Sequence, residues 1–247
     1  MRLKQGAEIV AKDAKERILA FIGYGQLNAR IWILGMEEAG GGEDNLTTRS
    51  QFNPVEDLYA AHPKLGITKH HEDSRTIQPQ WGRMADLMLR LGGTKSPTRE
   101  QRRNYQAEQL GRSYGDTLLV ELMPVPKPNL SAFDYPETFP EYASASSYYQ
   151  GVLPDRIRLL RKLIENHTPR VIVAYGSAFW RHYRSIMEPS FESVSNGFTV
   201  LSIQHTSMIL IPFWTSRSMN GRLEALEETI RDVIKEHEES PTFVRTS

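Results

Sequence analysis

Short, continuous apolar runs alternate along this chain with stretches in which apolar residues recur every three or four positions. Continuous runs bounded by glycine, proline or polar residues are typical of buried strands, and the three-to-four spacing is typical of amphipathic helices. The pattern predicts strands at about 30–35, 116–122, 170–176 and 198–203. It predicts helices at about 7–22, 81–91, 154–166, 177–186 and 219–237. Because strands that alternate with helices form parallel sheets covered on both faces, we expect a three-layer α/β/α sandwich around a four-stranded parallel sheet.

The chain length of 247 residues fits a single domain. We expect the core of that domain over about 28–236, with the helix at 7–22 before it and a frayed tail at 238–247. The polar stretch 45–80 predicts a long loop with short helical turns. The apolar segment 208–214 is expected to be a buried connection after the last strand.

Cysteine is absent, which excludes disulfides, cysteine-ligated metal sites and a cysteine nucleophile. No apolar stretch approaches eighteen residues, so we expect no membrane span. The amino terminus runs into an amphipathic pattern rather than the apolar core of a signal peptide, which favours the cytoplasm. The formal net charge is zero and gives no direct support for nucleic-acid binding. Acidic residues nevertheless predominate over 37–73 and basic residues over 75–112, and the basic stretch is either a phosphate-gripping surface or a solvated helix face.

The most distinctive segment follows the first predicted strand. The apolar run Ile31–Leu34 breaks into Gly35-Met36-Glu37-Glu38-Ala39-Gly40 and then into further glycines and acids. Open α/β sheets keep their sites at the carboxyl ends of the strands, and glycine lets a ligand approach the backbone closely. Glu37 and Glu38 are adjacent, so in extended backbone their side chains point in opposite directions. We expect Glu37 to face the site, and a loop carboxylate that caps a helix is the simpler alternative.

Two other predicted strands end in polar residues. Glu121 lies in the strand at 116–122, where a charge costs several kcal/mol unless it is paired or faces a wet cleft. Arg30 and Arg83 are candidate partners for it. His205 and Ser207 follow the strand at 198–203. We expect these strand ends to converge on one pocket, although a histidine or serine at a strand end is also compatible with a purely structural role.

The order of these motifs resembles the uracil-DNA glycosylase superfamily. Members of that superfamily carry motifs such as GMNPG, GLAPG or GEAPGxxED after the first strand and HPS after the fourth. Here the corresponding segments are Gly35-Met36-Glu37-Glu38-Ala39-Gly40 and His205-Thr206-Ser207, and Pro169–Gly176 is similar to the third strand of the superfamily. The prolines of both motifs are missing, and Glu121 stands where the superfamily often has an asparagine.

The resemblance implies a uracil-DNA glycosylase-like fold and the hydrolysis of an N-glycosidic bond in DNA, without cofactor or metal, as in DNA repair. Glu37 would activate or position the water, and His205 would stabilise the departing base. Glu121 would read the edge of the base. Because an ionised carboxylate only accepts hydrogen bonds, Glu121 favours a base with an amino group over uracil. The remaining substrate-binding positions are Gly35, Met36, Glu38, Phe52 as a stacking platform, and Ser207 as a phosphate contact.

Other readings of the sequence remain open. A non-catalytic nucleic-acid- or nucleotide-binding protein of the same fold is the main alternative, and a hydrolase of free nucleosides is a third. Phe52 is equally compatible with an ordinary core aromatic. His62, His70 and His71 do not have the spacing of a metal site, because adjacent histidines rarely converge on one ion. Ser177 lacks the glycine pattern of a nucleophile elbow, which disfavours a serine hydrolase.

Overall fold

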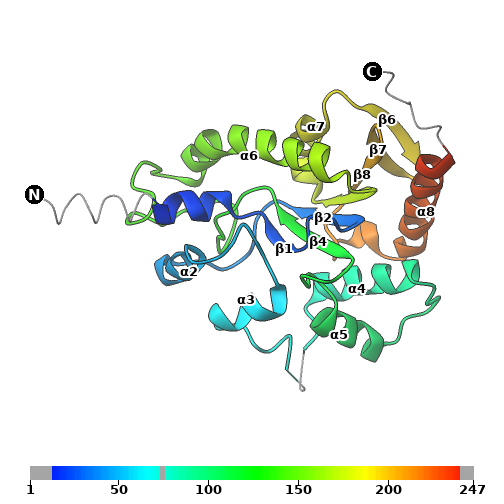
Figure 1. The fold of residues 1–247 in the computed structure, drawn as a ribbon, viewed down its shortest axis with the longest axis horizontal. Helices are drawn as coiled ribbons and strands as arrows, with labels where there is room; N and C mark the ends of the chain where they lie inside the picture. Colours follow the sequence, from blue (N-terminus) through cyan, green and yellow to red (C-terminus); the bar gives the residue numbers. More distant parts are fainter. Residues whose placement is uncertain (1–12, 73–75, 240–247) are drawn as a thin grey trace, which may run out of the picture.

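The computed structural model describes residues 13–72 and 76–239, which form an α/β fold around one mixed sheet (Figure 1). The sheet has eight strands in the order β3-β1-β4-β2-β5-β8-β7-β6. Their bounds are β1 Gly23–Gly25, β2 Ile31–Gly35, β3 Val55–Glu56, β4 Thr117–Glu121, β5 Val171–Tyr175, β6 Phe191–Ser195, β7 Phe198–Ile203 and β8 Thr206–Ile211. The helices are α2 Glu43–Arg49, α3 Leu58–Lys64, α4 Pro79–Leu91, α5 Arg99–Glu108, α6 Ala145–His167, α7 Trp180–Met187 and α8 Leu223–Glu239.

The centre of the sheet is parallel. β2 lies between β4 and β5, and β8 follows on the far side of β5, with all four strands running in the same direction. β1 pairs with β4 in the antiparallel sense, and β7 and β6 add an antiparallel edge beyond β8. The expectation of a four-stranded, wholly parallel sheet is therefore corrected to a mixed sheet of eight strands with a parallel centre.

The strand expected at 198–203 is present as β7, but it is not parallel to the others. Ile203 pairs with Thr206, so Gln204 and His205 form a two-residue turn, in which Gln204 has a φ of 50°. A turn this short makes consecutive strands antiparallel. The apolar segment expected to be a buried connection is instead β8, which runs beside β5.

Helices cover both faces of the sheet because neighbouring residues of each strand point to opposite sides. Trp32 and Leu34 join one buried cluster with side chains of α6 and α7, whereas Ile31 and Ile33 join a second cluster with α4 and α8. All four residues are at least 93% buried, as fully covered parallel strands require. Figure 1 shows α6 and α7 on one side of the sheet and α4 and α5 on the other.

Several element boundaries differ from the sequence prediction. α6 begins at Ala145 rather than near Pro154, because Ser144 and Ser147 form a capping box at its start. α8 continues to Glu239, so the first two residues of the expected frayed tail are helical, and the rest of that tail lies outside the described residues. Of the helix expected at 7–22, residues 13–20 are helical and 7–12 lie outside the described residues. No helix in 13–72 or 76–239 is long and apolar enough to cross a membrane.

Arg156 fastens α6 to the end of β4. Its side chain is 2% exposed and donates to the carbonyl oxygens of Leu122 and Glu121 at 2.8 Å and of Leu19 at 3.1 Å. These bonds connect a helix, a strand end and the amino-terminal helical segment, which are far apart in the sequence. Arg156 therefore fixes the strand end from which the Glu121 side chain projects.

We predict that Arg156→Met lowers the free energy of unfolding by about 3 kcal/mol, because three carbonyl oxygens lose their donor. Urea unfolding measures the difference. Arg158→Met is the matched control, since Arg158 lies on the same helix and pairs with Asp155 where both side chains are 71% exposed. The control should cost no more than about 0.5 kcal/mol. Equal losses for the two variants would contradict the fastening role.

Candidate functional site

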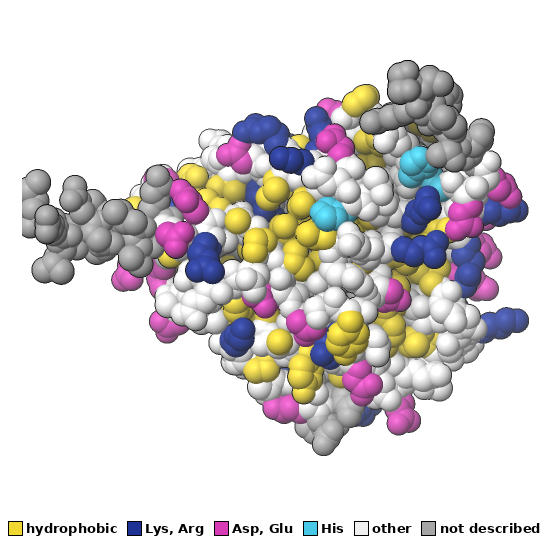
Figure 2. Space-filling model, viewed as in Figure 1, with side chains coloured by type: hydrophobic (Ala, Val, Ile, Leu, Met, Phe, Trp, Pro, Cys, Tyr) yellow, Lys and Arg dark blue, Asp and Glu magenta, His cyan; other side chains and the backbone are white. Residues whose placement is uncertain are grey.

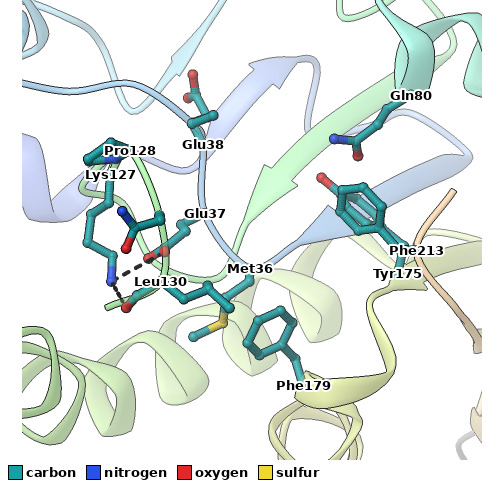
Figure 3. Close-up of a pocket in the computed structure, with 12 residues that line it drawn as sticks. Met36, Glu37, Glu38, Gln80, Lys127, Pro128, Leu130, Tyr175, Phe179 and Phe213 are labelled. Carbon is teal, nitrogen blue, oxygen red and sulfur yellow. Dashed lines mark hydrogen bonds and ion pairs between the residues drawn. The ribbon is translucent and has the colours of Figure 1, made fainter. Parts of the chain in front are cut away.

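The carboxyl ends of β2, β4 and β5 meet at one edge of the sheet, where Gly35 pairs with Glu121 and Tyr175 ends the neighbouring strand. A cavity of about 350 Å³ lies at this edge. Its lining comes from the segment after β2, from the loop after β4, from the start of α4 and from aromatic residues after β5 and β8 (Figure 3). This is the edge at which the sequence predicted a site.

Glu37 lies on the cavity wall in a basic and phenolic environment. The Tyr149 hydroxyl donates to both carboxylate oxygens at 3.0 Å, and Lys127 Nζ lies 3.3 Å from Oε1. Lys127 is fully buried and also donates to the Leu130 carbonyl and the Tyr149 hydroxyl at 2.8 and 2.6 Å. Burial raises the pKa of Glu37, and the opposing effects of Lys127 and Tyr149 do not cancel that rise. The result is an ion-paired carboxylate of increased basicity.

Glu38 belongs to a different network. Arg49, the last residue of α2, donates to the two carboxylate oxygens at 3.0 and 2.8 Å, and the Tyr24 hydroxyl lies 3.2 Å from Oε2. Burial acts to raise the pKa of Glu38, but the paired guanidinium outweighs it and holds that pKa below the usual range. Figure 3 shows Glu37 and Glu38 pointing in different directions, as adjacent residues in extended backbone do. Of the two adjacent glutamates, Glu38 is the one that stays ionised to lower pH.

Glu121 Oε2 is buried and has no hydrogen-bond partner in the described part of the chain. Neither candidate arginine reaches it, because Arg30 pairs with Glu238 and Arg83 with Asn220. Burial raises the pKa of Glu121 well above its usual value, and the charges of Glu38 and Glu37 raise it further. The neutral carboxylic acid is therefore favoured, and it both donates and accepts hydrogen bonds. The expectation that Glu121 only accepts hydrogen bonds is revised accordingly.

Gly35 leaves the space that Glu121 and Tyr175 occupy. A Cβ atom at this position would lie 2.6 Å from Glu121 Oε2 and closer still to the Tyr175 hydroxyl. Both oxygens thus sit directly above the Gly35 backbone. The Tyr175 ring also packs edge-on against Phe213, with centroids 5.8 Å apart, and both residues line the cavity. Glycine at the end of β2 is a steric requirement of this arrangement.

His205 and Ser207 lie at the opposite edge of the sheet. Ser207 pairs with Val171 at the start of β5, whereas Tyr175 at the cavity is the last residue of that strand. The Ser207 hydroxyl bonds to Ser202 Oγ at 2.7 Å and His237 Nε2 at 3.0 Å, and Ser207 is 1% exposed. The expectation that this motif meets Glu37 in one pocket is wrong, because the turn between β7 and β8 places it before the parallel strand rather than after it.

Phe52 also lies outside the cavity lining. Its ring is 3% exposed and packs against Phe21 with centroids 6.0 Å apart, so it is a core aromatic. The aromatic walls come instead from Phe179, Phe213 and Tyr175. Of the other predicted substrate-binding residues, Met36 and Glu38 line the cavity, whereas Gly35 and Glu121 lie beside it and are not part of its lining.

The sequence analysis missed Gln80, Lys127 and Tyr149 as members of the site. Lys127 carried a usable signal, since it lies in a proline-rich loop directly after a predicted strand. Gln80 and Tyr149 carried no such signal in the sequence, because each lies near the start of a helix whose position depends on tertiary packing.

Three histidines, His62, His70 and His71, cluster around Trp81. His62 is 3% exposed, its Nδ1 lies 3.2 Å from His71 Nε2, and its ring lies 5.1 Å from that of Trp81. Burial lowers the pKa of His62 to about 4. Within residues 13–72 and 76–239 no group of three or more histidine and carboxylate side chains is placed to hold a metal ion.

Three arginines of the basic stretch 75–112 are held in ion pairs. Arg90 and Arg102 bind Asp86 at 2.7 and 3.1 Å, and Arg112 binds Asp57 at 3.0 Å. Figure 2 shows Lys and Arg side chains scattered over one face rather than gathered in one patch, with hydrophobic side chains near its middle. That face presents no continuous basic surface.

No protein-family model matches this chain, and the search of curated proteins found no relative.

We predict that the contribution of His62 to stability falls as the pH falls from 7 to 5, because the unfolded chain binds a proton at His62 that the native protein resists. With a native pKa of about 4 against 6.5 unfolded, His62 alone lowers the free energy of unfolding by about 2 kcal/mol over this interval. Urea unfolding of the wild type and of His62→Phe at both pH values tests this. The change in the free energy of unfolding between the two pH values should differ by about 2 kcal/mol between the wild type and the variant, and an identical pH dependence in both proteins would contradict the assignment.

Proposed function

We propose that this chain is a cofactor-free hydrolase of N-glycosidic bonds in nucleic acid, with a uracil-DNA glycosylase-like fold, that releases a modified or mispaired base from DNA. The observation that carries the proposal is the cavity at the carboxyl edge of the parallel strands. There a basic carboxylate, Glu37, accompanies aromatic walls. Glu121, a carboxyl group that favours its neutral form, lies next to the cavity, beside the hydroxyl of the lining residue Tyr175. Two carboxyl groups held in different protonation states are typical of acid–base hydrolases.

The topology supports the proposed fold. Four parallel strands occupy the centre of the sheet, and the Gly35-Met36-Glu37 segment follows the first of them in the chain. The third, β5, ends in Tyr175 before Gly176 and a helix, as the resemblance implies. The fourth parallel strand is β8 rather than β7, so the segment from Pro212 onward occupies the place that the resemblance gave to His205.

Glu37 is the candidate base. Hydrolysis requires water to add to the sugar C1′ while the base leaves with the bonding electrons, so a group must take a proton from the water and stabilise positive charge on the sugar. A carboxylate with a raised pKa is a stronger base than an ordinary one. Lys127 and Tyr149 hold the Glu37 carboxylate in place, and that carboxylate also stabilises an oxocarbenium-like sugar electrostatically.

Glu121 takes over the part that the sequence analysis assigned to His205. A carboxylic acid kept neutral by its surroundings donates a hydrogen bond to the departing base and stabilises the negative charge that develops there. The same group supplies one donor and one acceptor to the base edge. An ionised Glu121 would disfavour uracil, because it could only accept hydrogen bonds. A neutral Glu121 can also donate, so uracil is again compatible with the site.

The second candidate function is binding without chemistry, and one observation favours it. The Glu37 side chain is 6% exposed, and its carboxylate already accepts from Tyr149 and contacts Lys127. A carboxylate held in this way can bind a ligand as well as it can activate a water molecule. A non-catalytic nucleic-acid- or nucleotide-binding protein uses the same cavity.

A screen of oligonucleotides, each with one altered base, tests the proposal through the abasic sites that form. We predict that Glu37→Gln lowers the rate of base release by about 10²–10⁴-fold, because the amide cannot take the proton. Glu121→Ala should lower it by about 10²-fold or more, because the developing charge loses a donor. Glu192→Gln is the matched control, since Glu192 lies on the exposed edge strand β6 and pairs with Arg184. It should retain the wild-type rate.

Three results would contradict the proposal, and each points to a different conclusion. DNA binding that weakens steeply with salt and yields no abasic product from any oligonucleotide would favour the binding protein. Release from free nucleosides alone would favour a nucleoside hydrolase. An unchanged rate in Glu37→Gln would overturn the role of Glu37.

A further inference from the structure

Gln80 presents an unsatisfied polar atom at the candidate cavity. It is the second residue of α4 and lines the cavity wall. Its carbonyl oxygen, Oε1, is buried and accepts no hydrogen bond from any described residue. Native proteins satisfy nearly all buried polar atoms, so this acceptor at the cavity wall requires a donor that the described residues do not supply.

The backbone that carries Gln80 is held firmly. The Gln78 side chain caps α4 by accepting from the Trp81 backbone N–H at 2.7 Å. The Gln106 side chain, which is fully buried, accepts from the Gln78 backbone N–H at 2.9 Å and donates to the Thr76 carbonyl at 3.0 Å. Two glutamines therefore fix the helix start by their own hydrogen bonds. The third, Gln80, is directed at the cavity instead, and nothing in the capping arrangement uses its amide oxygen.

The surroundings of Gln80 suit a flat ring. Figure 3 shows its amide above the rings of Tyr175 and Phe213, on the side of the cavity away from Lys127 and Glu37. Tyr175 is the last residue of β5, and burial raises the pKa of its hydroxyl, which remains a donor. Glu121 Oε2, the other unpartnered oxygen of this region, lies beside that hydroxyl above Gly35. This end of the cavity thus combines an acceptor, a hydroxyl donor and aromatic rings.

We propose that Gln80 is a specificity-determining residue whose Oε1 accepts a hydrogen bond from a ring N–H of a planar heterocycle, while the Tyr175 hydroxyl donates to an adjacent carbonyl. The inference rests on the proposed function, because it names the chemical class of base that the cavity binds. The chemistry required is a lactam edge, an N–H beside a C=O, on a ring small enough for about 350 Å³. A heterocycle methylated at that nitrogen lacks the donor and brings a methyl group against Oε1.

Ligand-observed NMR titration with two pairs of free bases tests the inference. The pairs are 1-methyluracil with 1,3-dimethyluracil and 9-methylhypoxanthine with 1,9-dimethylhypoxanthine, so the glycosidic nitrogen is blocked in every member and only the first of each pair keeps the lactam N–H. We expect the wild type to bind the first member of at least one pair about tenfold or more tightly than its partner methylated at the lactam nitrogen. Gln80→Leu should bind both members of that pair equally. Because Leu removes an unsatisfied buried acceptor, the ligand-free variant should keep or exceed the wild-type Tm, which a structural role for Gln80 would not allow.

Gln78→Leu is the contrasting variant, since it removes a cap rather than a ligand contact and should lower Tm while retaining discrimination. Discrimination that survives in Gln80→Leu, or failure of the wild type to bind any of the four bases, would overturn the inference. Base release from DNA is measured separately with the same proteins. If the wild type releases a base from DNA and Gln80→Leu does not change that rate, this inference is overturned and the proposed function stands. If the wild type discriminates between the members of a pair but releases no base from DNA, the hydrolase is overturned and this inference stands.

Discussion

Three carboxyl groups share one edge of the sheet, and the cost of burying their charge governs how the surrounding structure is built. An isolated buried carboxylate is strongly disfavoured, so each group needs its own solution. Glu38 is neutralised by the two-pronged contact of Arg49, and Glu37 by Lys127 with help from Tyr149. Glu121 Oε2 has no hydrogen-bond partner among the described residues, and the group favours the neutral form. The groups are interdependent, because the charges on Glu37 and Glu38 help keep the proton on Glu121.

The fold creates this crowding through a simple geometric fact, that parallel strands end at the same edge. β2 delivers Glu37 and Glu38, β4 delivers Glu121, and β5 delivers Tyr175. Gly35 makes the arrangement possible, because any larger residue would meet Glu121 and Tyr175. Arg156 holds the end of β4 from behind through backbone carbonyls, so the strand end is fixed without a cation touching the Glu121 carboxylate.

Much of this could be predicted from sequence because strands and strand ends are local features. The apolar runs located β2, β4, β5 and β7, and the acids at the ends of β2 and β4 marked the site edge. The direction of β7 could not be read from its residues, because it depends on the tight turn at Gln204 and His205. That single turn moved His205 to the far edge. Gln80, Lys127 and Tyr149 reach the cavity from loops and helix starts whose positions depend on packing across the whole molecule.

The central claim is that neighbouring carboxyl groups at one sheet edge are held in opposite protonation states. The most direct measurement is a pH titration of the glutamate side-chain carboxyl carbons by ¹³C NMR, with signals assigned from single Glu→Gln variants. The account predicts a Glu121 midpoint well above the ordinary value of 4.5, a Glu38 midpoint below that value, and a Glu37 midpoint between the two. Three midpoints close to the ordinary value of 4.5 would contradict it.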